Sequence, residues 1–262
     1  MNPSTKETVV INFEVQGPVD PSNPASEMLY RVTIFGAFAN GTTYSYTVEA
    51  ENVKITERED KSMRVDFFGG NEFGWSGSSL LKPRPVYIAT LNAPEVGIRG
   101  SITLHGNTVA PHYSCGSDAA GVDEQIITGI GWANALPDAN ATVSLQIRDT
   151  SMIFEGYGYH DKTWVDRPFG DALQSAFWGH ARLGPYAVVW WHSRAQDGAV
   201  LVQNILLRGR MDMSSRLIAL TTLTTLSAGE TVRYGPFFLE PQHRGACSCT
   251  GILEMPVLLW RT

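Results

Sequence analysis

The sequence predicts an all-β protein with two packed antiparallel β-sandwich or barrel domains, and three observations lead to that class. Short runs rich in β-branched and aromatic residues recur along the 262 residues. Clusters of Gly, Pro, Asn and Asp separate these runs, as at 16–27, 68–79 and 135–140. No long segment keeps a helical period with a cap at each end. Together, about fifteen expected strands exceed what one small barrel uses.

The expected strands divide into two groups at the pair Asp149–Thr150. The first group lies at 8–15, 29–38, 42–51, 62–68, 86–92, 97–104, 124–133 and 141–149. The second lies at 151–159, 175–183, 186–194, 200–209, 216–226, 231–240 and 251–260. We therefore expect one β domain at 1–149 and another at 150–262. No flexible linker separates them, so we expect tight packing and a cleft, which is a favoured place for small-molecule sites.

Composition excludes several classes of partner. The 26 acidic residues outnumber the 20 basic ones and no basic block stands out, so we expect no nucleic-acid binding. The longest apolar runs, such as 187–191, are too short to span a bilayer, so we expect no stable membrane insertion. The first ten residues lack the apolar segment of a signal peptide, which predicts a cytoplasmic chain. The secretory pathway stays open if an N-terminal segment is missing from the sequence.

Aromatic and ionisable side chains are concentrated in two segments, 154–169 and 175–198. Because strand side chains alternate between faces, Trp178 shares a face with His180 and Arg182. Similarly, Trp190 shares a face with His192, while Trp191 points to the other side. This mixture predicts a pocket with aromatic walls and a few orienting polar groups. The alternative is that these aromatic side chains only fill a core.

A metal centre is a weaker alternative. His160, His180 and His192 would need to converge as three histidines do in some zinc sites. Their spacing does not require convergence, and neither an H-x-H pair nor an H-E-x-x-H helix is present. We therefore expect no metal.

The segments GYGYHDKTWVDRPF (156–169) and FWGHARLGPYAVVWWHSRAQDG (177–198) resemble the fungal lipocalin-like Diels–Alderases. This family is related to the carotenoid hydratases called hydroxyneurosporene synthases. The segments at 73–80, 97–104, 111–116 and 129–147 are similar to the same family. The resemblance covers roughly 5–198, and its most specific element is the Y-H-D-x-x-W pattern that begins at Tyr159.

The resemblance implies two β domains, the second of them lipocalin-like, with a ligand pocket at or near their junction. It implies a cofactor-free pericyclase that performs a Diels–Alder or hetero-Diels–Alder cyclisation in secondary metabolism. The expected substrate is a polyene or quinone-methide-type molecule derived from a polyketide, a polyketide–peptide or a terpenoid. After Gly198 the sequence departs from the family pattern, which predicts an incomplete second barrel.

The resemblance and the residue chemistry together suggest roles for nine residues. The predicted catalytic residues are Lys162, Trp164, His160 and Asp161; the predicted substrate-binding residues are Tyr159, Trp178, Arg182, Trp190 and Trp75. Lys162 or Arg182 would donate to a substrate carbonyl. Trp75, from an expected loop, would close the pocket from the first domain.

Two pairs of residues have structural interpretations. His160 and Asp161 either form a structural hydrogen bond at the domain junction or transfer protons. Asp166 and Arg167 are expected to form a local salt bridge.

Three functions remain open on the sequence alone. A cycloaddition needs a pocket that holds one reactive conformer, with a hydrogen-bond donor to the substrate carbonyl. A hydratase or isomerase of an apolar polyene would need His160 or Asp161 as a placed acid. A lipocalin-like carrier would bind an apolar ligand and return it unchanged.

Overall fold

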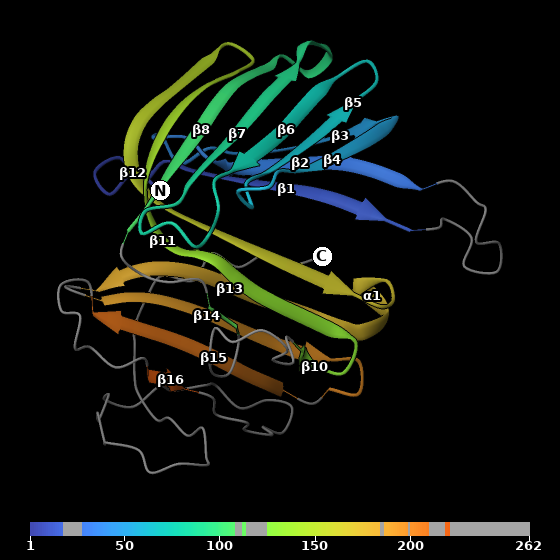
Figure 1. Cartoon of the computed structure of the whole chain (residues 1–262), viewed down its shortest axis with the longest axis vertical. Coiled ribbons are helices and arrows are strands. Elements are labelled where there is room, and N and C mark those ends of the chain that lie inside the picture. The colour runs from blue at the N-terminus through green and yellow to red at the C-terminus, as the bar shows by residue number, and fades with distance from the viewer. Residues whose placement is uncertain are drawn as a thin grey trace. The chain divides into compact units, whose positions relative to one another are not determined.

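The part of the protein that the structure describes is built almost entirely from antiparallel strands (Figure 1). The computed structural model describes residues 1–17, 28–107, 112–113, 125–183, 186–198, 200–209 and 218–220. Within these ranges the only helices are α1, Phe169–Ala172, and the 3-10 turn η1, Pro94–Val96. Neither of them is long or apolar enough to cross a membrane. The predicted all-β, antiparallel class is confirmed.

Contacts divide the chain into two compact units, and each combines two separate stretches of sequence. Unit 1 comprises Met1–Thr108 and Asp138–Tyr159, and unit 2 comprises Val109–Pro137 together with the chain from His160 onward. This division differs from the single boundary predicted at 149–150. The reason is that β11 (Ile130–Ile147) and β12 (Thr150–Val165) are long strands, each of which begins in one unit and ends in the other.

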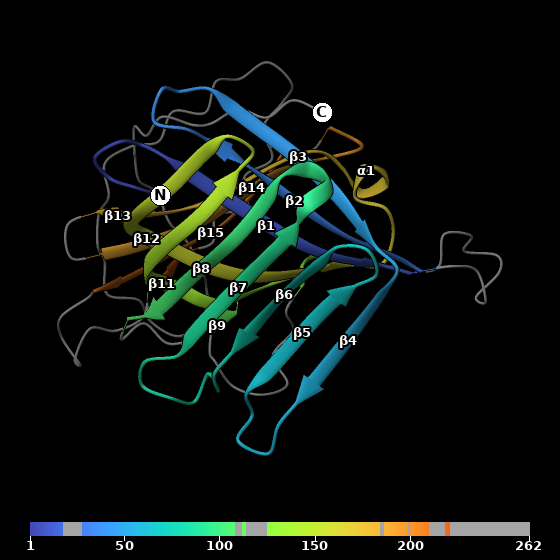
Figure 2. The ribbon, with the colours of Figure 1, turned by 90° about the horizontal axis from the view of Figure 1, so that it is seen from above.

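Unit 1 contains two antiparallel sheets. The first consists of β1 (Thr8–Gln16), β2 (Leu29–Ala37) and β3 (Thr43–Ala50). The second runs in chain order through β4 (Asn52–Glu57), β5 (Met63–Phe68), β6 (Glu72–Gly77), β7 (Val86–Ala93) and β8 (Ile98–Gly106) (Figure 2). β11 extends this second sheet beside β8, and β12 pairs with β11.

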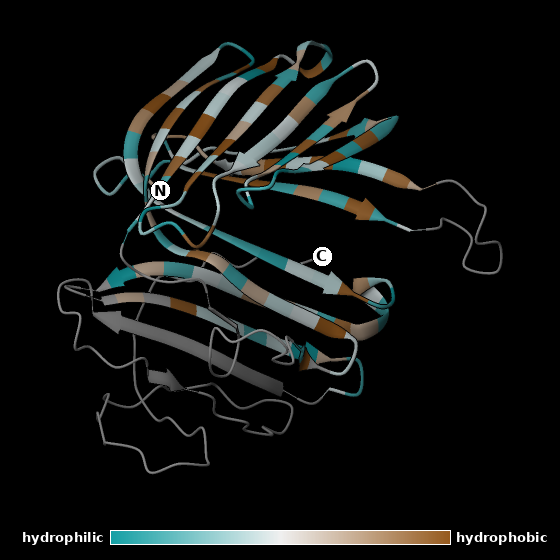
Figure 3. Ribbon diagram, in the orientation of Figure 1, coloured by the Kyte–Doolittle hydropathy of each residue, from teal (hydrophilic) through white to brown (hydrophobic). Residues whose placement is uncertain are grey.

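The core of unit 1 lies between its two sheets. Val32 and Ile34 from β2 are fully buried in one cluster with Phe67 from β5 and Ile147 from β11. Apolar residues alternate with polar ones along many of these strands (Figure 3), which is the pattern of a sheet with one buried face. The Phe13 and Phe67 rings, one from each sheet, lie 5.6 Å apart between centroids. Unit 1 is therefore a β-sandwich.

Two strands of unit 1 were not expected from the sequence. β4 follows β3 after one residue, Glu51, and carries too few apolar residues to show a clear alternation. β6 lies in a glycine-rich stretch whose composition is typical of a loop. At Gly74, a Cβ atom would collide with the Val65 carbonyl of β5, so glycine permits close strand pairing there.

Strand β11 is continuous through 135–140, where a turn was expected because of Pro137. The proline falls where β11 changes partners. Residues 139–147 pair with β8, whereas 133–134 pair with β9 (His112–Tyr113) and 130–131 pair with β10 (Gln125–Ile127). None of these three ladders includes position 137, so the missing N–H of proline removes no hydrogen bond from them.

The described part of unit 2 is dominated by one four-stranded antiparallel sheet. Its strands follow chain order: β13 (Leu173–Leu183), β14 (Tyr186–Ala195), β15 (Val200–Gly209) and β16 (Ile218–Leu220). Figure 1 shows β13, β14 and β15 side by side. The strand expected at 216–226 is described only at 218–220, and those expected at 231–240 and 251–260 lie outside the described residues.

Candidate functional site

One face of the β13–β14 pair is the more buried of the two. On β14, Val189, Trp191 and Ser193 are buried, whereas the alternate residues Trp190 and His192 are only half-buried. This alternation confirms that Trp190 and His192 share a face opposite Trp191. We call the side that carries Trp191 and Ser193 the inner face of this sheet.

The strand register decides which β13 residues join the inner face. Trp178 lies directly opposite Trp191, and Arg182 lies opposite Ala187. Because directly paired residues project to the same side of a sheet, Trp178 and Arg182 belong to the inner face. Trp190 pairs with Gly179 and projects to the other side. The three residues that were expected to bind one substrate therefore do not share a face.

Trp191 is the centre of an aromatic cluster. Its ring lies 5.5 Å from that of Trp132 on β11, 6.2 Å from that of Trp178, and 6.3 Å from that of Phe169 on α1. These four residues are the Trp191 cluster, and all belong to unit 2. Trp132 is 1% exposed and Trp191 is 3% exposed, but Trp178 is 42% exposed. The cluster therefore runs from a dry interior to the surface.

Asp161 orients one indole of this cluster. The Nε1–H of Trp132 donates to the Asp161 Oδ2 at 2.7 Å, linking β11 to β12. A buried indole N–H needs a partner, and a carboxylate is a strong one. The sequence predicted a hydrogen bond between His160 and Asp161; the bond between Trp132 and Asp161 was not predicted.

The second buried indole has no such partner. Trp191 Nε1 and, two residues along β14, Ser193 Oγ are buried without a hydrogen bond. So is Asn134 Oδ1, two residues along β11 from Trp132. Within the part of the chain that the structure describes, Asn71 in unit 1 carries the one further atom of this kind. Such atoms are rare in folded proteins, so three in one region of unit 2 need an explanation.

His160 and His192 are both held toward the neutral form. Burial lowers the pKa of His160, and the charge of the neighbouring Asp161 offsets this only in part. His160 and Asp161 are consecutive on β12, so their side chains leave opposite faces of the strand. Burial also lowers the pKa of His192, and the Arg194 guanidinium lowers it further. A neutral imidazole can donate and accept hydrogen bonds but is a poor source of protons.

The other predicted residues of β12 lie in different environments. Tyr159 and Trp164 are half-buried, while Lys162 is exposed. The Trp164 ring lies directly over Gly131 of β11, where any Cβ would collide with the indole. Asp166 forms the expected local ion pair with Arg167 at 2.8 Å.

Trp75 lies on strand β6, not on the loop that was expected. Its ring stacks on Tyr87 of β7 at 5.7 Å and packs against the core of unit 1. Burial raises the pKa of Tyr87 to about 12. The expectation of a loop was wrong because glycines at 74 and 77 permit strand pairing as well as turns.

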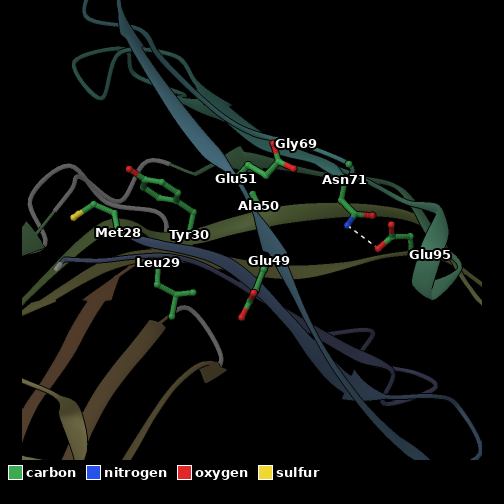
Figure 4. Close-up of a pocket in the computed structure, with 10 residues that line it drawn as sticks. Met28, Leu29, Tyr30, Glu49, Ala50, Glu51, Gly69, Asn71 and Glu95 are labelled. Atoms are coloured by element: carbon green, nitrogen blue, oxygen red, sulfur yellow. Dashed lines mark hydrogen bonds between the residues drawn. The ribbon is translucent and has the colours of Figure 1, made fainter. Parts of the chain in front are cut away.

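Unit 1 contains a pocket of about 470 Å³ that the sequence did not indicate (Figure 4). Its lining includes three acidic residues, Glu49, Glu51 and Glu95, and no basic one. Asn71 Nδ2 donates to Glu95 Oε2 at 3.3 Å across one end of the pocket. A lining of this polarity suits an apolar polyene poorly.

The structure groups no metal ligands in the ranges that it describes, since no three His, Cys, Asp or Glu side chains there could hold an ion. His180 lies on β13 opposite Val189 and therefore on the inner face. His192 projects to the other face of the sheet, so the two histidines lie on opposite sides. The described residues of unit 2 present aromatic surfaces and groups that can donate hydrogen bonds.

The sequence of this chain matches a known protein family. The family model described as Diels-Alderase-like matches residues 16–231. The chain belongs to this family. The match continues past Gly198 to residue 231, so the expectation that the family pattern stops at Gly198 was wrong.

Two curated fungal proteins are similar over most of the chain. The quinolone epoxide rearrangement protein penF of Penicillium thymicola is 32% identical over 197 residues, which are 75% of this chain and 54% of that protein. The quinolone epoxide rearrangement protein asqO of Emericella nidulans is 31% identical over 196 residues, 74% of this chain and 52% of that protein. The chain spans about half the length of these relatives.

Solved structures support the fold. The crystal structure of CghA with Sch210972 has a TM-score of 0.59, with 17% identity over 87% of this chain and 63% of that one. A second crystal structure of CghA gives the same TM-score at 16% identity. At such identities the likeness concerns the fold alone.

Sequence reasoning missed several residues in and beside the Trp191 cluster. Trp132, Asn134, Phe169 and Ser193 were not singled out, and Trp191 was noted only for its opposite face. Trp132 belongs to a segment that resembles the family, which was the one signal available. The proximity of β11 to β14 depends on tertiary packing, and strand alternation cannot reveal it.

Proposed function

We propose that this chain is a pericyclase that folds a flexible small molecule for a [4+2] cycloaddition, of the Diels–Alder or hetero-Diels–Alder type, in fungal secondary metabolism. Membership of the Diels-Alderase-like family supports this class of reaction. The observation that carries the proposal is the buried aromatic surface of the Trp191 cluster together with the unpaired polar atoms of Trp191 and Ser193. An apolar substrate with one polar end requires such a combination.

The reaction would draw on shape more than on acid or base. A cycloaddition forms two σ bonds from two π bonds, so substrate and product are isomers and no proton has to be transferred. Holding the diene against the dienophile removes the entropy of the other conformers and so lowers the barrier. Rigid indole rings such as Trp132, which Asp161 holds in place, are suited to this task.

His160 and Asp161 were the acids that the hydratase alternative would need. Protonation of an alkene needs an acid that holds a proton ready at working pH. The lowered pKa of His160 leaves it neutral there, and Asp161 accepts a hydrogen bond from Trp132. Both observations favour structural or orienting roles for these two residues over proton donation.

A second candidate is the rearrangement of an epoxide, and the names of the two fungal relatives favour it. This reaction is also an isomerisation, and opening the ring generates negative charge on the epoxide oxygen. Donors in a dry site would stabilise that charge.

The test is a comparison of metabolites from the source organism with and without the gene. If the accumulating precursor and the normal product have equal mass, an isomerisation is supported. NMR of the two compounds then separates the candidates, because a cycloaddition consumes two π bonds whereas an epoxide rearrangement consumes the three-membered ring. A mass difference of one water would establish the hydratase. A product that only falls in amount would establish a carrier and overturn the enzyme proposal.

A further inference from the structure

We infer that the indole N–H of Trp191 and the hydroxyl of Ser193 are the two donors that hold a carbonyl oxygen of the ligand on the inner face of the β13–β14 sheet. The inference rests on the proposed function in one respect, since it assumes a small-molecule ligand on this face. It goes further by naming the polar contact and the chemical group recognised.

The two buried indoles differ in their hydrogen bonding. Trp132 and Trp191 lie in ring contact and are almost equally buried. Trp132 Nε1 has Asp161 as its partner at 2.7 Å, while Trp191 Nε1 has none. A buried donor left unpaired costs about 1–3 kcal/mol. The protein meets this need for one indole and leaves it unmet for its neighbour.

A second buried polar group without a partner lies on the same strand as Trp191. Ser193 is 1% exposed, and its Oγ is buried without a hydrogen bond. It stands two residues from Trp191, so both side chains leave β14 on the same face. Two neighbouring orphan groups that can both donate are harder to ascribe to accident than one.

A carbonyl oxygen is the kind of ligand atom that would satisfy both groups. Residues two apart on a strand have Cα atoms about 6.6–6.8 Å apart. A carbonyl oxygen has two lone pairs and accepts from donors at about 2.7–3.0 Å. One such oxygen can therefore lie between an indole N–H and a hydroxyl that approach it from neighbouring positions.

The surroundings suit the rest of such a molecule. Trp178 lies opposite Trp191 on the same face and is partly exposed, which gives an aromatic surface at the edge of the cluster. A flat ring system could stack there while its carbonyl reaches inward. The group recognised is thus a carbonyl on a planar, mostly apolar compound.

The same donors fit the proposed chemistry. A carbonyl attached to the dienophile gains negative charge in the transition state, and donors aimed at it lower the barrier. Lys162, one of the donors expected from the sequence, is exposed on β12. We assign the donation to the substrate carbonyl to Trp191 and Ser193 instead.

The experiment uses two matched probes that differ only in the carbonyl. The first is 1-methyl-4-phenylquinolin-2(1H)-one, the quinolinone, and the second is 1-methyl-4-phenyl-1,2-dihydroquinoline, the quinoline, which has CH2 in place of the carbonyl. Binding of each to the full chain is measured by isothermal titration calorimetry. The quinolinone should bind more tightly than the quinoline.

The variants each remove one donor while keeping the shape. Replacing Trp191 with 3-benzothienylalanine exchanges only the N–H for sulfur, and Ser193→Ala removes the hydroxyl. Each should weaken quinolinone binding about three- to tenfold, the effect of one hydrogen bond, and leave quinoline binding unchanged. Ser193→Thr retains the hydroxyl and should preserve binding. Ser144→Ala on the exposed side of β11 is the control that should change nothing.

The thermal stability of the ligand-free protein gives a second, independent measurement. Because neither donor has a partner in the folded chain, its removal should leave the melting temperature unchanged or raise it. A clear fall would mean that the group holds the fold together, which would overturn the inference. Equal weakening of both probes, no weakening of either, or a quinolinone that binds no better than the quinoline would overturn it as well.

These outcomes are separable from those of the proposed function. The calorimetry involves no turnover, so a metabolite comparison that rejects the pericyclase leaves the binding result in place. Conversely, a chain that forms the cyclised product while its Trp191 and Ser193 variants bind both probes normally would keep the function and lose this inference.

Discussion

The interiors of the two units are built from different side chains. In unit 1 the core is aliphatic and phenyl, with Val32, Ile34, Phe67 and Ile147 closing the space between two sheets. A tyrosine at its margin, Tyr44, donates its hydroxyl to the Thr8 carbonyl at 3.0 Å. In the described part of unit 2, indoles occupy the interior, and two groups that can donate on β14 stay unpaired.

Under the proposed function, this difference separates a stable scaffold from a binding surface. An aliphatic core gains stability from burial and loses nothing in hydrogen bonds. A tryptophan-rich interior with orphan polar atoms gives up some stability in exchange for groups that a ligand can use. Substitutions in unit 1 should therefore act on folding, and those in the Trp191 cluster should act more on binding. The following predictions test this contrast, in order of decreasing effect.

The largest expected loss of stability is in the core of unit 1. Phe67 is 2% exposed and contacts Phe13 from the opposite sheet, so Phe67→Ala should lower the free energy of unfolding by about 3–5 kcal/mol. Its neighbour Phe68 is 44% exposed, and Phe68→Ala should change stability by no more than about 0.5 kcal/mol. Urea denaturation measures both values. Similar losses in the two variants would contradict the sandwich core.

A smaller loss is expected where unit 2 does satisfy a buried indole. Asp161→Ala strands the Trp132 N–H, which should cost about 1–3 kcal/mol of stability. Asp161→Asn retains an accepting oxygen and should restore part of it.

The matched control for Asp161 is Asp166→Ala. It breaks the exposed ion pair with Arg167 and should cost about 0–1 kcal/mol. Chemical denaturation at neutral pH measures all three variants. If Asp161→Ala proved no worse than Asp166→Ala, the Trp132–Asp161 bond would have no structural weight.

The smallest effect concerns pH. Burial lowers the pKa of His160 and His192, so below about pH 6.5, the ordinary His pKa, the unfolded chain binds protons more readily than the folded chain. The free energy of unfolding should therefore be highest above about pH 6.5. It should fall as the pH is lowered from there toward the pKa values of the two histidines in the folded chain.

Replacement of the buried imidazole isolates its share of that pH dependence. His160→Gln should flatten the slope of stability between about pH 7.5 and about pH 5.5, measured by urea titration. His105→Gln, at an exposed position of β8, is the control and should retain the slope. A slope that is unchanged in His160→Gln would show that His160 titrates alike in both states.

The sequence alone determined the class of the fold and most of its strands. Alternation along β7 or β14 follows from the period of two in a strand, and it correctly separated Trp190 and His192 from Trp191. The segments around Tyr159 and Trp178 also carried enough of the family pattern to indicate the Diels-Alderase-like family.

Tertiary structure decided what a local pattern cannot contain. The continuity of β11 through Pro137 depends on which strand pairs with it at each point, and the strand nature of β6 depends on close approach to β5. The Trp191 cluster joins side chains about sixty residues apart, because Trp132 reaches Trp191 only when β11 lies across β14. Whether a buried donor is paired depends likewise on every neighbour in space. The orphan groups of Trp191 and Ser193, which carry the strongest hypothesis about this protein, were therefore beyond the reach of the sequence.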